Sequence, residues 1–198
     1  MEDDDVALLD RWCAGDAAAG NLLFKRHFTS LYRLFEHKTS GEVDDLVQET
    51  FLQCLKSRAS FQHKSSFRTY LFGIARNVLL GHWRKQAIAR PTLDFEEISI
   101  ASLSTSIGTR LARRQERVDL LTVLRTLPFE QQLLLEMYYW QDLDREQLAE
   151  VFGVETATIG SRLFRARQAL HDGLAARGAT QPSGDQLDDW ARALSDDE

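Results

Sequence analysis

Cysteine and proline are scarce in this chain, and no long apolar run interrupts it. Only two cysteines and three prolines occur among 198 residues. Cys13 and Cys54 lie far apart without metal-ligand spacing, so the sequence predicts neither a disulfide framework nor a zinc site. No apolar stretch approaches the roughly 20 residues that span a bilayer, and acidic residues follow Met1 where a secretory leader would be basic. We therefore expect no membrane insertion and a cytoplasmic location.

Catalytic signatures are absent as well. The five histidines are scattered along the chain. The sequence contains no H-E-x-x-H, no G-x-S-x-G and no phosphate-binding glycine loop. We expect a protein that is not an enzyme and that has no cofactor and no metal.

The chain is rich in acid, with a formal net charge of −6, but its basic residues gather in two places. Residues 61–115 carry nine basic and three acidic side chains, and residues 156–177 carry four basic and one acidic. Phosphate binding depends on Lys and Arg, so an acidic protein with two basic islands can still bind nucleic acid locally.

Apolar residues recur at helical spacing through most of the chain, and no strand pattern stands out. The sequence therefore predicts an all-α protein made of two small helical domains joined by a flexible linker. The expected segments are a bundle of about four helices at 1–86, a linker at 87–108, a second helical domain at 109–177 and an acidic extension at 178–198.

Turn residues indicate where the helices break. Gly15-Asp16, Ser40-Gly41 and the polar run 57–66 are the expected breaks in the first domain. Pro128 is expected at the first position of a helix in the second domain, where no amide donor is needed.

The stretch 144–170 has the spacing of a helix-turn-helix. Asp144 followed three residues later by Gln147 predicts a helix start with mutual capping. Ala149 would let two helices cross closely, Gly153 would form the turn, and Ile159 would pack the second helix onto the first.

Hydroxyl groups and guanidinium groups are expected on the exposed face of that second helix. Such a mixture suits phosphates and base edges in the major groove of DNA. The candidate DNA-binding residues are Thr156, Thr158, Ser161, Arg162, Phe164 and Arg165, and Arg167 is expected on the same exposed face. A solvated arginine face on an ordinary helical hairpin is the alternative.

A second motif lies in residues 44–85. Asp45, Gln48 and Glu49 fall within about one helical turn and form a polar, acidic patch that suits a basic partner surface. Farther on, aromatic and amide groups alternate with cations, a pattern that can hold an unstacked base and its backbone. These candidates are Ser60, Gln62, His63, Lys64, Arg68, Tyr70, Arg76, Asn77, His82, Arg84 and Lys85.

The two motifs together resemble the extracytoplasmic-function (ECF) group of bacterial RNA polymerase sigma factors. Residues 44–85, which include the string DLVQETF, resemble region 2 of that group, and residues 124–170 resemble region 4. The resemblance implies an alternative sigma factor that binds core RNA polymerase and promoter DNA and promotes strand opening. It also implies an anti-sigma factor as a candidate partner, because family members often have one.

The resemblance assigns a role to each set of residues. It implies that Asp45, Gln48 and Glu49 contact the clamp helices of the polymerase. It further implies that the candidates between Ser60 and Lys85 read the minus-10 element, and that those between Thr156 and Arg165 read the minus-35 element.

The chain departs from the family pattern at two places. Gly73-Ile74 stands where primary sigma factors have a tryptophan pair for strand opening, which implies weaker melting and stricter promoter choice. Gly160 stands where relatives often have Lys or Arg, which puts one expected minus-35 contact in doubt.

Two alternatives stay open at this point. A stand-alone helix-turn-helix regulator would explain residues 144–170 but leave 44–85 without a function. In the extension, a short apolar stripe is formed by Leu187, Trp190, Ala191 and Leu194. This stripe fits either a helix that docks on region 4 or a partner and weakens DNA binding, or a solubilising tail.

Overall fold

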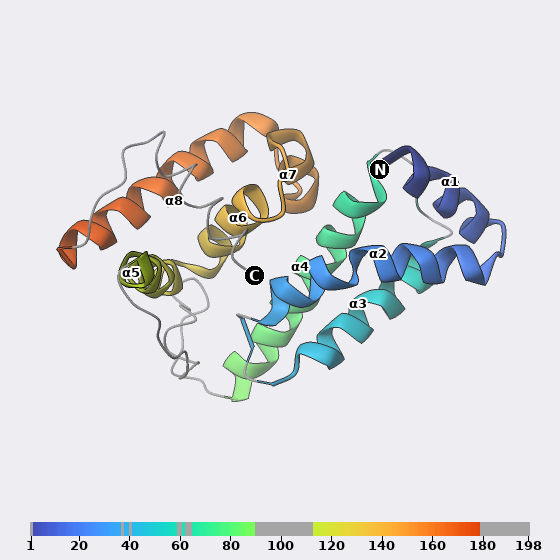
Figure 1. The fold of residues 1–198 in the computed structure, drawn as a ribbon, viewed down its shortest axis with the longest axis horizontal. Helices are drawn as coiled ribbons and strands as arrows, with labels where there is room; N and C mark the ends of the chain where they lie inside the picture. Colours follow the sequence, from blue (N-terminus) through green and yellow to red (C-terminus); the bar gives the residue numbers. More distant parts are fainter. Residues whose placement is uncertain are drawn as a thin grey trace. The chain divides into compact units, whose positions relative to one another are not determined.

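The computed structural model describes residues 2–36, 38–39, 41–58, 61, 65–89 and 113–178. These residues form eight α-helices and no strand (Figure 1), which confirms the predicted all-α fold. The helices are α1 (Glu2–Cys13), α2 (Ala17–Glu36), α3 (Val43–Ser57), α4 (Phe67–Ala89), α5 (Arg113–Thr126), α6 (Phe129–Tyr139), α7 (Arg145–Phe152) and α8 (Thr156–Ala176).

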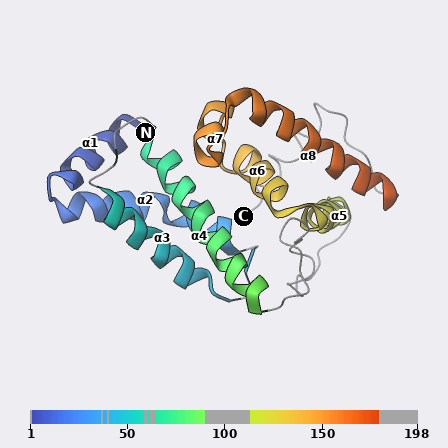
Figure 2. The same cartoon turned by 180° about the vertical axis from the view of Figure 1, so that it is seen from behind.

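The chain divides into two compact units, and α1 to α4 belong to the first. Figures 1 and 2 show α1 folding back along α2, while α3 packs against both α2 and α4. Trp12, Phe35 and Phe67 are each at most 2% exposed and mark the core of this unit. The apolar spacing therefore predicted the four-helix bundle correctly.

Residues at the turn between α1 and α2 explain why the chain reverses there. Gly15 has a φ of 104°, a left-handed conformation that glycine adopts without steric cost. Asp16 caps α2, because its Oδ1 accepts the backbone amides of Ala18 at 2.9 Å and Ala19 at 3.2 Å. The hydrogen bond from the Arg11 side chain, followed by that from the Ala19 amide, lowers the pKa of Asp16. The predicted break at Gly15-Asp16 is thus confirmed.

A buried polar cluster also ties α1 to α2. The Asp5 carboxylate lies 2.6 Å from His27 Nε2 and accepts a hydrogen bond of 2.8 Å from Arg26, which also pairs with Asp4. Asp5 and His27 are each 7% exposed. Their mutual hydrogen bond replaces the hydrogen bonds to water that these polar groups lose on burial.

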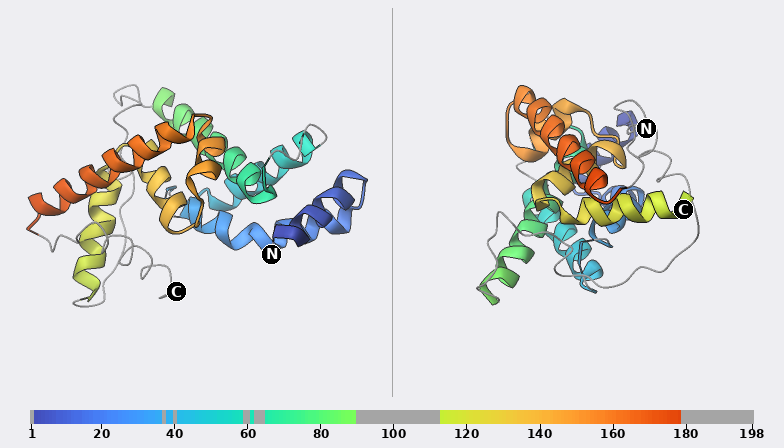
Figure 3. Two further views of the ribbon diagram at one scale, coloured as in Figure 1. Left: turned by 90° about the horizontal axis from the view of Figure 1, so that it is seen from above. Right: turned by 90° about the vertical axis from the view of Figure 1, so that its left-hand side faces the viewer.

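The second unit contains α5, α6 and α8, and α7 begins within it. Figure 3 shows α5 crossing α8 at a steep angle. The two helices approach each other closely at Gly173 of α8, because this residue has no side chain. A Cβ added there would lie 2.3 Å from Val123 Cγ1 of α5. Pro128 is the N-cap of α6 and so lies one position before the first helical residue, whereas the sequence predicted it at that first helical position. Its carbonyl accepts hydrogen bonds from the backbone amides of Gln131 and Gln132.

The linker and the extension predicted from the sequence fall largely outside the described residues. α4 continues to Ala89 and so includes the first three residues of the predicted linker 87–108. The rest of that linker lies outside the described residues. The extension 178–198, including its apolar stripe, lies outside them too, except for residue 178. These boundaries remain predictions.

The two cysteines occupy contrasting environments. Cys13 is exposed, whereas Cys54 is buried in α3 and its burial raises the pKa of its thiol to about 12. A protonated thiol is a poor nucleophile. We therefore expect iodoacetamide at pH 8 to modify Cys13 in the folded protein and Cys54 only after unfolding in urea, as measured by peptide mass spectrometry. Equal modification rates at both sites in the folded chain would contradict the packing of α3.

Candidate functional site

The polar patch of α3 lies on its solvent side, as predicted. Asp45, Gln48 and Glu49 are all exposed, while Leu46 and Val47 between them are 7% and 3% exposed and face the core. Glu49 accepts a hydrogen bond of 2.9 Å from Gln53 one turn later. The patch therefore presents carboxylate and amide groups on a helix whose apolar side is buried in the core.

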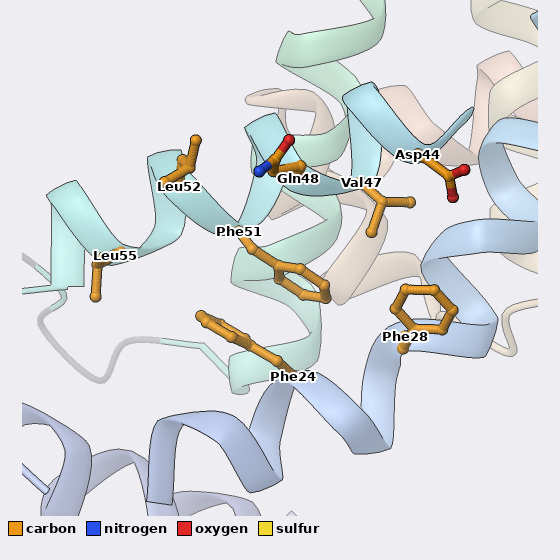
Figure 4. A pocket seen from close by; sticks show the side chains of 8 residues that line it. All are labelled: Phe24, Phe28, Asp44, Val47, Gln48, Phe51, Leu52 and Leu55. Carbon is orange, nitrogen blue, oxygen red and sulfur yellow. The ribbon is translucent and has the colours of Figure 1, made fainter. Parts of the chain in front are cut away.

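An apolar groove beside this patch was missed by sequence reasoning. It has a volume of about 310 Å³ and lies between α2 and α3 (Figure 4). The residues that line it are Phe24, Phe28, Asp44, Val47, Gln48, Phe51, Leu52 and Leu55. Gln48 thus belongs to both the polar patch and the groove, so the two form one continuous surface.

Large apolar side chains in the groove are open to solvent. Phe28, Leu52 and Leu55 are 43%, 42% and 43% exposed, and the rings of Phe24 and Phe51 stack at 4.3 Å. Clustered exposed apolar residues with a polar rim are typical of protein interaction sites. The four-residue spacings of Phe24 with Phe28 and of Phe51 with Leu55 were the available signal, but the same spacing also fits a core helix.

Four candidates precede α4 in the sequence. Ser60, Gln62, His63 and Lys64 lie outside the described residues. The structure describes the other seven candidates of this set, all of them on α4.

The candidates on α4 lie on different sides of the helix. A spacing of seven residues corresponds to about two turns, so Tyr70, Asn77 and Arg84 follow one stripe along α4. Arg68 and His82 are four turns apart on roughly the opposite side. Asn77, Arg84 and Lys85 are exposed, and Arg68, Tyr70, Arg76 and His82 are half-buried. A single nucleic-acid strand lying on one face would therefore not meet all seven.

Three of the half-buried candidates contact other side chains of the chain. Tyr70 Oη lies 2.5 Å from Ser57 Oγ, and the Arg68 guanidinium sits 5.5 Å from the centre of the Phe72 ring. His82 Nε2 lies 2.8 Å from Gln86 Nε2, and burial lowers the pKa of His82. The lowered pKa favours a neutral imidazole at pH 7. A neutral imidazole can donate one hydrogen bond and accept another, but it adds no positive charge.

The helix-turn-helix has the geometry predicted from the sequence. The Gln147 amide donates to Asp144 Oδ1 at 2.8 Å, and the Asp144 amide donates to Gln147 Oε1 at 3.0 Å, which completes the capping box. Ala149 and Ile159 are 8% and 0% exposed, and Gly153 has a φ of 64°. α8 is thus fixed as the second helix of the motif.

α8 presents most of its predicted DNA-binding residues to solvent. Thr156, Ser161, Phe164 and Arg165 are exposed, and Thr158 and Arg162 are half-buried. Phe164 is 69% exposed, which is unusual for a large aromatic side chain. The side chains of Ser161 and Arg165 donate hydrogen bonds to carbonyls one turn earlier in α8.

Arg167 differs from the expectation of an exposed cation on α8. Its Nε donates a hydrogen bond of 2.7 Å to Tyr139 Oη. The guanidinium also lies 5.1 Å from the ring centre of Tyr138 and 5.5 Å from that of Tyr139. These contacts hold α8 against α6, so Arg167 has a structural role that the sequence pattern did not indicate.

The described residues contain neither a metal-ligand cluster nor a membrane-spanning helix. Within the described ranges, no group of three or more His, Cys, Asp or Glu side chains could hold a metal ion. None of the helices described above is long and apolar enough to cross a membrane.

Comparison with solved structures supports the fold. The chain superposes with a TM-score of 0.65 on CnrH, solved in complex with the cytosolic domain of CnrY, at 22% identity over 87% of this chain and 98% of that one. The sigma factor RpoE of Bartonella quintana, solved with the anti-sigma factor NepR, gives a TM-score of 0.59 at 24% identity over 76% of this chain and 95% of that one.

Sequence comparison identifies the family. The family models for Sigma-70 region 2 and Sigma-70, region 4 match residues 23–88 and 117–170. The ECF RNA polymerase sigma-E factor of Escherichia coli is 28% identical over 84% of this chain and 92% of that protein. The ECF RNA polymerase sigma factor SigM of Mycobacterium tuberculosis is 30% identical over 85% of this chain and 84% of that protein. The chain therefore belongs to the ECF sigma factors of the sigma-70 family.

Proposed function

We propose that this sigma factor binds core RNA polymerase through Asp45, Gln48 and Glu49 together with the apolar groove beside them. As an ECF sigma factor, the chain is an alternative transcription initiation factor and not an enzyme, and a stand-alone regulator is not favoured. The observation that carries the proposal is the exposure of the polar patch and of Phe28, Leu52 and Leu55 in the groove, large apolar side chains that the unit does not bury in its own core. Polar groups would select the partner, and apolar groups would supply the area.

Promoter recognition is assigned to the two other sets of residues. For the minus-10 element, we propose Ser60, Gln62, His63 and Lys64, which precede α4 in the sequence, and the solvent-facing stripe of α4 that contains Asn77 and Arg84. Strand opening by these residues is a binding event, because stacking and hydrogen bonds to an unpaired base offset the cost of unstacking it. For the minus-35 element, we propose that α8 enters the major groove with Arg165 and Phe164.

An anti-sigma factor is the proposed regulatory partner, and the cytoplasm is the proposed location. One structure with a similar fold was solved with an anti-sigma factor bound. Two proteins that each cover the exposed groove between α2 and α3 would exclude one another sterically. A partner that covers it would therefore compete with the polymerase.

Two single substitutions separate polymerase binding from DNA binding. Arg165→Ala is expected to weaken binding to the minus-35 element by roughly 1–3 kcal/mol, because a guanidinium that contacts a base edge is lost. Gln48→Ala is expected to weaken core binding and leave the DNA contacts unchanged. Titration of core polymerase with each labelled variant, followed by run-off transcription on promoter DNA, measures the two effects.

The control for Arg165→Ala is Arg177→Ala. Arg177 is also exposed but lies 12 residues later in the chain, about 18 Å along the helix axis. Its removal changes the net charge equally and should leave minus-35 binding nearly unchanged. If Arg165→Ala and Gln48→Ala reduced core affinity equally, the assignment of the two surfaces would be wrong. Tight promoter binding in the absence of polymerase would favour a stand-alone regulator.

A further inference from the structure

Gly160 is a residue of α8 that the folded chain by itself does not explain. It lies in the second turn of α8 and has no positive φ, so its backbone does not require glycine. A Cβ added there would meet no heavy atom within 4 Å among the described residues outside its own helix backbone. A Cβ added at Gly173 of the same helix would lie only 2.3 Å from Val123 Cγ1. Close packing therefore explains the glycine at position 173 but not the one at position 160. After proline, glycine is the least favourable residue inside a helix.

Two neighbours of Gly160 on the helix surface carry apolar groups that are open to solvent, namely the methyl group of a threonine and the ring of a phenylalanine. Thr156 lies one turn before it and Phe164 one turn after it, so the three share one face of α8. Thr156 is exposed, and the Phe164 ring is 69% exposed. A glycine between a threonine and a phenylalanine leaves a shallow notch, with apolar groups at both ends.

We propose that this notch receives the 5-methyl group of a thymine in the minus-35 element, which makes Gly160 and Phe164 specificity determinants. The proposal rests on the insertion of α8 into the major groove. There, the thymine methyl is the one apolar group that base pairs present, and threonine methyl groups and phenylalanine rings are suitable contacts for it. A side chain at position 160 would occupy the space that the methyl group needs.

The test combines Gly160→Ala with removal of the methyl group from DNA. A minus-35 element is first selected from random sequence with the wild-type holoenzyme, and each of its thymines is then replaced by deoxyuridine. Gly160→Ala is expected to raise the thermal midpoint of the free protein by about 2–4 °C. The same variant in the holoenzyme should bind the thymine-containing promoter about fivefold more weakly or worse.

Deoxyuridine at one position should restore much of the affinity lost by Gly160→Ala, while it weakens binding by the wild-type holoenzyme. The affinity of both holoenzymes for a promoter with a scrambled minus-35 element should be the same. The proposal is overturned if the selected element lacks thymine, if Gly160→Ala binds it like the wild type, or if no single deoxyuridine restores affinity. Arg165→Ala serves as the reference: if it too leaves binding unchanged, the insertion of α8 itself is wrong.

Discussion

Trp12→Ala is expected to lower the free energy of unfolding of the first unit by about 3–5 kcal/mol, the cost typical of a buried Trp replaced by Ala. Trp12 is 2% exposed and lies edge-on to Phe24 and Phe67, with ring centres 5.2 and 6.3 Å away. A Cβ added at Gly20 would lie only 2.4 Å from the indole, so the ring fills the space between α1 and α2. Urea denaturation followed by circular dichroism measures the loss.

Val6→Ala is the matched control for Trp12→Ala. Val6 lies on the same helix but is 47% exposed, so its truncation should change stability by less than about 0.5 kcal/mol. Similar losses for both variants would show that α1 is not held by the indole. A wild-type melting curve for Trp12→Ala would contradict the packing of α1 on α2.

Local features of the fold were predictable because they depend on residues close together in sequence. The capping box of Asp144 and Gln147 requires only two side chains three positions apart, and both of its hydrogen bonds form. The turns at Gly15 and Gly153 follow from the positive φ that glycine permits. Element type and the breaks at these turns could therefore be derived from spacing and turn chemistry.

Features that depend on distant partners were not predictable. Arg167 was expected to face solvent, but its partner Tyr139 lies 28 residues away and belongs to another helix. Tyr70 similarly bonds to Ser57 of α3. An exposed position on a helix and one covered by a neighbouring helix have the same local pattern, so periodicity alone does not separate them.

The groove between α2 and α3 illustrates the same limit for function. Leu52 and Leu55 follow the apolar spacing of α3 and would be assigned to the core from sequence, yet both are more than 40% exposed. The apolar stripe of α3 is wider than α2 and α4 can cover. The polar residues Asp45, Gln48 and Glu49 were found because a family motif includes them, whereas apolar interface residues resemble core residues in composition.

The groove also leads to the largest expected effect on function, which is that of Leu52→Asp. If core polymerase covers the groove, the new carboxylate would be buried without a partner, at a cost of about 3–5 kcal/mol. Core affinity should then fall by a factor of about 100 or more. Because Leu52 is 42% exposed in the free protein, the stability of the chain should change little. Fluorescence titration of the labelled variant with core polymerase measures the affinity.

Leu22→Asp supplies the control that separates burial in the interface from a general effect of charge. Leu22 is 46% exposed on α2 but is not among the residues that line the groove. It lies two positions from Phe24, so the helix turns its side chain toward a different face. The control should therefore bind core polymerase like the wild type and gain the same negative charge. Equal losses in the two variants would indicate long-range repulsion between the sigma factor and polymerase, because only a contact at the groove distinguishes position 52 from position 22.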